Sequence, residues 1–207
     1  MKKLKVTIIG YGGMGSFHAK LIQANPEVEV HGIFDILESR QQAGEADGYS
    51  AYASLEEALN DACADTILIA TPNDVHKEIA VQALEAGKHV ICEKPVTLNS
   101  EELSEIMHTA KEHERVFMVH QNRRWDSDFQ MVKDLYENRK IGEVFHIESR
   151  VQGANGIPGD WRHLKAHGGG MLLDWGVHLL DQLLYMIDSP LAKVAADLSY
   201  ILGDEVD

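Results

Sequence analysis

The sequence predicts an α/β fold: an N-terminal doubly wound parallel sheet, followed by a smaller, incomplete α+β domain with an open, mostly antiparallel sheet. Over residues 1–121, short and nearly continuous apolar runs alternate with helical patterns, as in parallel strands covered on both faces. After residue 121 the strand candidates alternate apolar with polar residues, which is typical of a sheet with one packed face. We therefore expect two domains, residues 1–121 and residues 122–207, with a boundary near Gln121.

Strands and helices alternate along the first domain. The strands are predicted at residues 5–9, 28–34, 66–70, 89–92 and 116–120, and the helices at residues 14–24, 55–60, 75–86 and 101–114. Ser54 begins a capping box, because Glu57 follows it by three residues. Gly87 ends its helix where a left-handed residue is favoured.

The second domain begins with a polar stretch that carries arginines. The pattern then predicts a helix to about residue 139, a strand at 143–152, a glycine-rich loop, a helix at 170–186 and a strand at 193–202. No internal repeat or long flexible linker is evident in the sequence.

The first strand runs directly into a glycine-rich turn. Gly10 permits the turn, Gly12 lets the backbone approach a pyrophosphate, and Gly15 lets the next helix pack closely on the sheet. Asp35 ends the next apolar run, where a carboxylate can accept hydrogen bonds from both ribose hydroxyls of adenosine and would repel a 2′-phosphate. The alternative is an ordinary strand-to-helix turn. We predict a Rossmann fold that binds NAD rather than NADP, with contacts from Gly10, Gly12, Gly13, Met14, Gly15 and Asp35.

Composition favours a cytoplasmic enzyme. The 207 residues are 44% hydrophobic and 25% charged, and 19 Lys and Arg against 33 Asp and Glu give a net charge of −14. This charge opposes binding to nucleic acid or to an anionic membrane, and no apolar run is long enough to span a bilayer. We expect Cys63 and Cys92 to be reduced thiols.

Two further strands deliver polar groups to the carboxyl edge of the sheet, where ligands bind in such folds. Thr71, Pro72 and Asn73 follow the third strand, and Glu93, Lys94 and Pro95 follow the fourth. Beside a nicotinamide, Lys94 could orient a substrate hydroxyl or lower its pKa. The alternative for Lys94 is a surface lysine at a strand end.

A second cluster lies between Gly168 and Asp181. On a helix, Asp174, His178 and Asp181 would share one face, and a histidine beside a carboxylate can act as a general base. The alternative is an ion pair on the helix face or a buried histidine with satisfied hydrogen bonds. His163 and His167 are four residues apart but lack a third ligand at a convincing spacing, so we predict no metal site.

Together these motifs resemble the Gfo/Idh/MocA oxidoreductases, the family of glucose-fructose oxidoreductase and inositol dehydrogenase. The resemblance covers essentially the whole chain and implies that Lys94, Asp174 and His178 form the catalytic group. It also implies that Glu93 lies near the nicotinamide ribose and that Thr71, Pro72 and Asn73 line the cofactor cleft, with His76 beside them. A softer resemblance, to sugar and inositol dehydrogenases, suggests that the substrate is bound by Arg123, Trp161, Arg162, Asp174 and His178.

The expected function is NAD-dependent oxidation of a secondary hydroxyl of a sugar, cyclitol or related polyol. Two alternatives stay open, a non-catalytic protein that senses NAD and an NAD-assisted glycoside hydrolase of the same fold. Family members continue well past the point where this sequence stops, so we expect a fragment or a shortened form. Its unfinished second sheet should favour homo-oligomers and leave little or no dehydrogenase activity.

Overall fold

The computed structural model describes residues 3–153, 159–200 and 205–207. The chain divides into two compact units, Met1–His120 and Gln121–Asp207. We describe each unit by itself.

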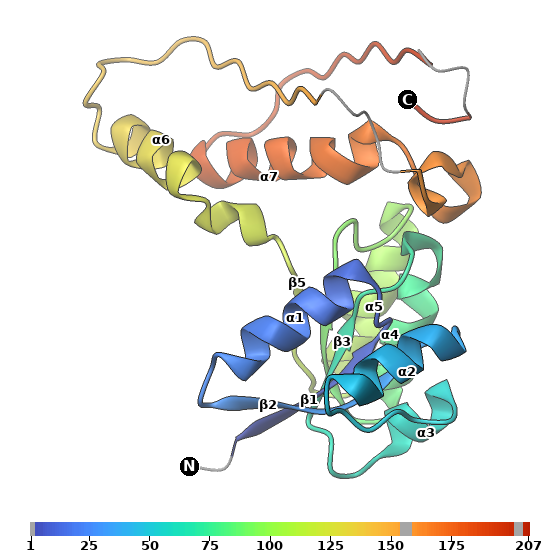
Figure 1. Cartoon of the computed structure of the whole chain (residues 1–207). Helices are drawn as coiled ribbons and strands as arrows, with labels where there is room; N and C mark the ends of the chain where they lie inside the picture. The colour runs from blue at the N-terminus through green and yellow to red at the C-terminus, as the bar shows by residue number, and fades with distance from the viewer. Residues whose placement is uncertain (1–2, 154–158, 201–204) are drawn as a thin grey trace. The chain divides into compact units, whose positions relative to one another are not determined.

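The first unit is a five-stranded parallel sheet with the strand order β2-β1-β3-β4-β5 (Figure 1). The strands are β1 (Leu4–Ile9), β2 (Val28–Phe34), β3 (Thr66–Ile69), β4 (His89–Cys92) and β5 (Phe117–Val119). The order reverses at β1, because β2 lies on one side of it and β3 on the other. That reversal makes the doubly wound topology, and ligands bind at such a switch point.

Helices cover both faces of this sheet (Figure 1). They are α1 (Gly13–Gln23), α2 (Glu38–Ala46), α3 (Leu55–Asn60), α4 (His76–Glu85) and α5 (Ser100–Glu112). Because side chains alternate along a strand, Val6 and Ile8 of β1 pack with Ala19 of α1, whereas Ile9 packs in a second cluster with residues of α3, α4 and α5. The sheet therefore has one apolar core on each face.

Local signals set the helix ends. The Ser54 hydroxyl accepts a hydrogen bond from the Glu57 amide at 3.1 Å, as the capping box predicts, and Asn99 caps α5 in the same way through the Glu102 amide at 2.9 Å. Gly87 has φ +77°, the left-handed conformation expected at the end of α4.

The second unit contains two longer helices, α6 (Ser127–Glu137) and α7 (Val177–Met186). A π-helical turn, Leu172–Gly176, leads directly into α7, and short 3₁₀ turns lie at Asn122–Trp125, Trp161–His163 and Lys165–His167. The expected α-helix over residues 170–186 is thus wrong in its first part, where the π-helical turn lies.

The open antiparallel sheet expected in this unit is not confirmed. Residues 143–152 and the described part of 193–202 form no β-ladder (Figure 1), although both segments alternate apolar with polar residues. Alternation shows which residues could share a face, but a strand also needs a neighbour that pairs with its backbone, and neither segment has one in the described residues. Residues 201 and 202 lie outside them.

Among the helices that the structure describes, none is both long and apolar enough to cross a membrane.

Candidate functional site

The glycine-rich turn between β1 and α1 has the shape needed to hold a dinucleotide. Gly10 has φ +90°, and a Cβ on Gly15 would lie 1.9 Å from the Gly10 carbonyl oxygen, so a side chain at either position would be strained or blocked. A Cβ on Gly12 or Gly13 would meet nothing within 4 Å. The space beside these two residues is open, and the amino end of α1 begins there without a side-chain cap. A pyrophosphate fits this combination of open space and free helix amides.

Asp35 lies just beyond β2 and is held against the turn. Its Oδ2 accepts a hydrogen bond from the Tyr11 amide at 2.7 Å, and its Oδ1 accepts one from the Leu37 amide at 2.9 Å. A carboxylate oxygen can accept more than one hydrogen bond, so both oxygens can still accept ribose hydroxyls. The contact of Asp35 with the adenosine ribose stays a prediction.

The segment after β3 forms one wall of the carboxyl edge. Thr71 and Asn73 lie here, Asn73 is buried, and the buried Thr71 hydroxyl has no hydrogen-bond partner among the described residues. An orphaned hydroxyl at this edge is suited to a ligand. Pro72 lies between these two residues and precedes the 3₁₀ turn Asn73–Val75.

His76 is fully buried and links the ends of two strands. Its Nδ1 lies 3.0 Å from the Pro95 carbonyl oxygen, and its Nε2 lies 3.0 Å from the Thr71 carbonyl oxygen. Burial lowers the pKa of this imidazole. Both ring nitrogens thus lie against backbone carbonyls, so His76 connects the segment after β3 to the segment after β4. A direct contact with the cofactor stays a prediction.

Glu93, at the carboxyl end of β4, is the centre of a buried hydrogen-bonded cluster. Its Oε1 lies 2.6 Å from His18 Nε2 and 3.0 Å from His120 Nδ1, and its Oε2 accepts the Lys94 amide at 3.2 Å. Burial alone would raise the pKa of Glu93, but the hydrogen bonds from His120 and His18 outweigh it and lower the pKa to about 2. The predicted residues Glu93 and Lys94 are thereby joined to two histidines that the sequence prediction did not include.

The burial of His18 could have been predicted from the pattern of residues along its helix. Gly15, His18, Ala19 and Ile22 recur at the spacing of the inward face of α1, so burial of His18 beside the sheet was predictable. His120 directly follows the last strand and carried no comparable signal.

In the second unit, the predicted substrate residues gather around the π-helical turn. Asp174 Oδ1 lies 3.4 Å from Arg162 Nε, and the Arg162 guanidinium also stacks 4.4 Å from the centre of the Trp161 ring. His178 is buried at the start of α7, with its ring centre 5.9 Å from that of Trp175.

Trp175 also connects Arg123 to this group. The Arg123 guanidinium carbon lies 4.4 Å from the centre of the Trp175 ring, and the same arginine pairs with Asp126 at 2.9 Å. The five predicted substrate residues thus fall into two groups within this unit, Trp161–Arg162–Asp174 and Arg123–Trp175–His178, and the neighbouring residues Asp174 and Trp175 lie in the same π-helical turn.

Asp181 has a different partner from the one its spacing suggested. Both of its carboxylate oxygens accept from Arg124, at 2.8 and 2.6 Å, a bidentate pair that joins α7 to the 3₁₀ turn before α6. The π-helical turn also changes the geometry on which the shared face of Asp174, His178 and Asp181 was predicted, because it is wider than an α-helical turn.

The glycines before Asp174 permit close packing. A Cβ on Gly169 would lie 2.1 Å from the Arg162 carbonyl oxygen, and the Gly170 amide donates to that same oxygen at 3.0 Å. The glycine run thus lets the segment that bears Arg162 lie against the segment that bears Asp174.

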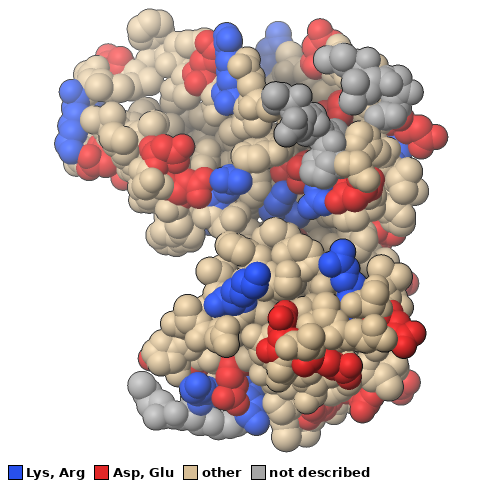
Figure 2. Space-filling model, in the orientation of Figure 1, with Lys and Arg blue, Asp and Glu red and all other residues tan. Residues whose placement is uncertain are grey.

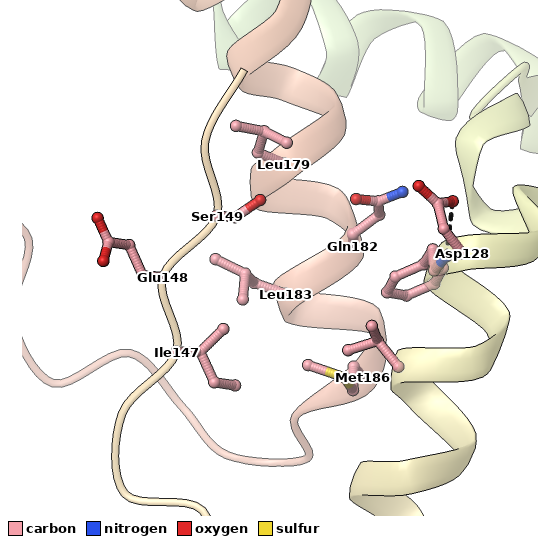
Figure 3. Close-up of a pocket in the computed structure, with 10 residues that line it drawn as sticks. Asp128, Ile147, Glu148, Ser149, Leu179, Gln182, Leu183 and Met186 are labelled. Atoms are coloured by element: carbon pink, nitrogen blue, oxygen red, sulfur yellow. Dashed lines mark hydrogen bonds between the residues drawn. The ribbon is translucent and has the colours of Figure 1, made fainter. Parts of the chain in front are cut away.

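A hollow of about 210 Å³ lies in this unit between α6, α7 and residues 147–149 (Figure 3). Its lining is largely apolar and includes Phe129, Leu179, Leu183 and Met186, and it contains none of the predicted site residues. On the face drawn in Figure 2, acidic side chains are spread over both units with lysines and arginines between them.

Comparison with known proteins places this geometry in a family. Residues 4–121 match the family model described as "Oxidoreductase family, NAD-binding Rossmann fold", and residues 129–207 match the GFO/IDH/MocA C-terminal domain. An NAD-binding protein from Listeria innocua has a crystal structure that superposes with a TM-score of 0.98 at 62% identity, over 100% of this chain and 61% of that one.

Curated relatives agree with this match. The uncharacterised oxidoreductase YdgJ of Escherichia coli is 36% identical, over 96% of this chain and 57% of its own length. The scyllo-inositol 2-dehydrogenase (NADP(+)) IolW of Bacillus subtilis is 32% identical, over 93% of this chain and 54% of its own length. The chain spans about half the length of these relatives. Its two matched domains show that it belongs to the Gfo/Idh/MocA family of oxidoreductases, whose N-terminal domain is an NAD-binding Rossmann fold.

Proposed function

We propose that this protein is an NAD-dependent dehydrogenase that transfers a hydride between a secondary hydroxyl of a sugar, cyclitol or related polyol and the nicotinamide. The observation that carries the proposal is the edge of the first sheet, where the open glycine turn, Asp35, the orphaned Thr71 hydroxyl and the Glu93–Lys94 turn all follow parallel strands.

The residues of the first unit fit the cofactor. Gly12 and Gly13 leave room for the pyrophosphate, Asp35 can accept the ribose hydroxyls, and Glu93 is ionised at the edge where the nicotinamide ribose is expected. Bound NAD would supply the acceptor for the hydride. The carboxylate of Asp35 would repel a 2′-phosphate, and this is the reason for proposing NAD rather than the NADP that the name of the Bacillus relative gives.

Three side chains would act on the substrate. The Lys94 ammonium would orient and polarise the reacting hydroxyl, His178 would accept its proton, and Asp174 would help to position the substrate and support the imidazole. Arg123, Trp161 and Arg162 would contribute binding through guanidinium donors and an aromatic face.

The polyol substrate is proposed from two sources. The relative from Bacillus subtilis is named for scyllo-inositol, a ring that carries only secondary hydroxyls. The cluster around Trp175 and Asp174 also combines guanidinium groups, a carboxylate and indole rings, which together can donate to, accept from and stack on such a ring.

A panel of sugars and polyols, assayed with NAD by absorbance of NADH, tests the proposal. Oxidation of at least one polyol at an ordinary enzymatic rate is the expected result, on this chain or on a longer form that contains it. NAD binding with no turnover of any compound would favour the sensing protein instead. Release of a free sugar from a glycoside with no net NADH would favour the NAD-assisted hydrolase.

A further inference from the structure

The carboxylate of Glu93 is held by three donors from three different parts of the first unit. The side chain is 7% exposed, and a buried carboxylate is stable only when hydrogen bonds replace its water. His18 and His120 approach one oxygen at 2.6 and 3.0 Å, while the Lys94 amide donates to the other oxygen at 3.2 Å.

This arrangement fixes which ring nitrogens carry hydrogen. An ionised carboxylate only accepts hydrogen bonds, so both His18 Nε2 and His120 Nδ1 must be donors toward it. The three side chains also offer ligand atoms within 4.8 Å of one another, a spacing found in metal sites. A His18–Glu93 distance of 2.6 Å is instead that of a charge-assisted hydrogen bond.

The two histidines come from different elements of the first unit. His18 projects from α1, the helix that follows the glycine turn, and the His120 amide, just past β5, donates to the Cys92 carbonyl at 2.8 Å. Their rings pack edge to face with centres 4.6 Å apart. The carboxylate between them therefore has little freedom to rotate, and the amide of the next residue, Lys94, is bonded to that same carboxylate.

We propose that His18 and His120 are positioning residues that clamp the Glu93 carboxylate and thereby hold Lys94 in a single orientation at the edge of the sheet. The inference rests on the proposed function, in which Lys94 acts on the substrate hydroxyl. It adds two residues that are hydrogen-bonded to the Glu93 carboxylate.

The test first removes each histidine ring and then restores only an N–H donor at the position of the ring nitrogen. His18→Ala and His120→Ala remove the hydrogen bonds, whereas His18→Gln places an amide near the Nε2 position and His120→Asn places one near the Nδ1 position. His108→Ala is the matched control, because His108 is an exposed histidine on α5. Thermal unfolding checks that each variant is folded.

The first readout needs no substrate. Trace labelling of lysines with acetic anhydride, read by mass spectrometry, gives the reactivity of Lys94 relative to the exposed Lys20 and Lys111. We expect both alanine variants to change this ratio by about threefold or more, the size of coupling seen between contacting residues. The glutamine and asparagine variants should return it toward the parent value, and the control should leave it unchanged.

The second readout is kcat with NAD and a polyol. The alanine variants should lose about tenfold or more in kcat, since small misplacements of a catalytic group have effects of this size, and the donor-restoring variants should recover most of the loss.

Unchanged Lys94 reactivity in folded alanine variants would overturn the clamp. So would a change that Gln and Asn fail to reverse, because packing rather than hydrogen bonding would then be responsible. If the parent oxidises no polyol but the labelling pattern holds, the proposed function fails while the clamp on Lys94 stands.

Discussion

Asp35 shows how one side chain can set a cofactor preference. Both of its oxygens are bonded to backbone amides, so the carboxylate cannot swing away from an incoming 2′-phosphate without losing those bonds. The adenosine ribose is predicted to bind beside Asp35, and NAD and NADP differ at that ribose, so a negative charge fixed there would discriminate between them.

Replacing Asp35 by serine should therefore weaken or reverse a preference for NAD. We expect the parent to bind NAD more tightly than NADP in calorimetric titration, and Asp35→Ser to narrow that difference. Asp188→Ser, which removes an exposed carboxylate in the second unit, should leave both affinities unchanged. Equal or tighter binding of NADP by the parent would contradict the argument.

Substitutions of Lys94 and His178 should lower the rate of the chemical step without weakening cofactor binding. If they act on the reacting hydroxyl, Lys94→Ala and His178→Ala should each lower kcat by about 10²-fold or more and leave NAD affinity nearly intact. Steady-state kinetics and NAD titration on the same preparations provide the measurement. Turnover of both variants at the parent rate would remove the catalytic assignment and favour the sensing protein.

At the scale of elements, the turn into α1 depends on a missing side chain. A Cβ on Gly15 would overlap the Gly10 carbonyl oxygen, whereas one on Gly13 would meet nothing. Gly15→Ala should therefore lower the melting temperature and weaken NAD binding, because helix and turn must separate to admit the methyl group. Gly13→Ala should leave the melting temperature of the protein without cofactor close to that of the parent. Equal thermal stability of the two variants would show that the close approach does not matter.

Asp61 links the end of α3 to β2 and makes this link dependent on pH. The Tyr52 hydroxyl donates to it at 2.6 Å, the Cys63 amide at 2.7 Å and His31 lies at 3.1 Å, and these contacts lower its pKa from 3.8 to about 2. A depressed pKa means that the ionised carboxylate stabilises the folded state above pH 3.8, and that this contribution is lost as the pH falls toward about 2.

The free energy of unfolding of Asp61→Asn should therefore fall below that of the parent near neutral pH, and the gap should shrink below pH 3.8. Urea unfolding at several pH values measures it. A difference in free energy of unfolding between the two proteins that stays constant as the pH falls toward about 2 would show that the charge of Asp61 contributes nothing to stability.

Most of the first unit could be predicted from sequence, because continuous apolar runs and caps such as Ser54 act locally. The helix α2 was not predicted: its residues, from Glu38 to Ala46, are mostly polar and show no apolar stripe, and only Gly44 is buried. The π-helical turn before α7 was also missed, since an apolar pattern over residues 170–186 predicts a helix but does not distinguish a single π-helical turn from an α-helical one. The catalytic and binding roles stay predictions. The cluster of His18, Glu93 and His120 could not be predicted from the spacing of residues, because its members come from three different elements and meet only in the folded structure.

At the scale of the whole molecule, α7 leaves apolar side chains in water. Leu180 and Leu184 are four residues apart, so they share one helix face, and they are 50% and 54% exposed. Burial of apolar area is worth about 25 cal/mol per Å², so contact between two copies through this face would be favourable. We therefore predict that the protein self-associates through its second unit.

Light scattering after size-exclusion chromatography measures this over a range of concentrations. The parent should be larger than 23.1 kDa, and Leu180→Glu combined with Leu184→Glu should shift it toward the monomer, because association would then bury two carboxylates. Met107→Glu places one such carboxylate at a 59% exposed site on α5 of the first unit and should leave the association intact. A parent that stays monomeric at every concentration would contradict the prediction, and an effect of Met107→Glu equal to that of the leucine variant would move the interface to the first unit.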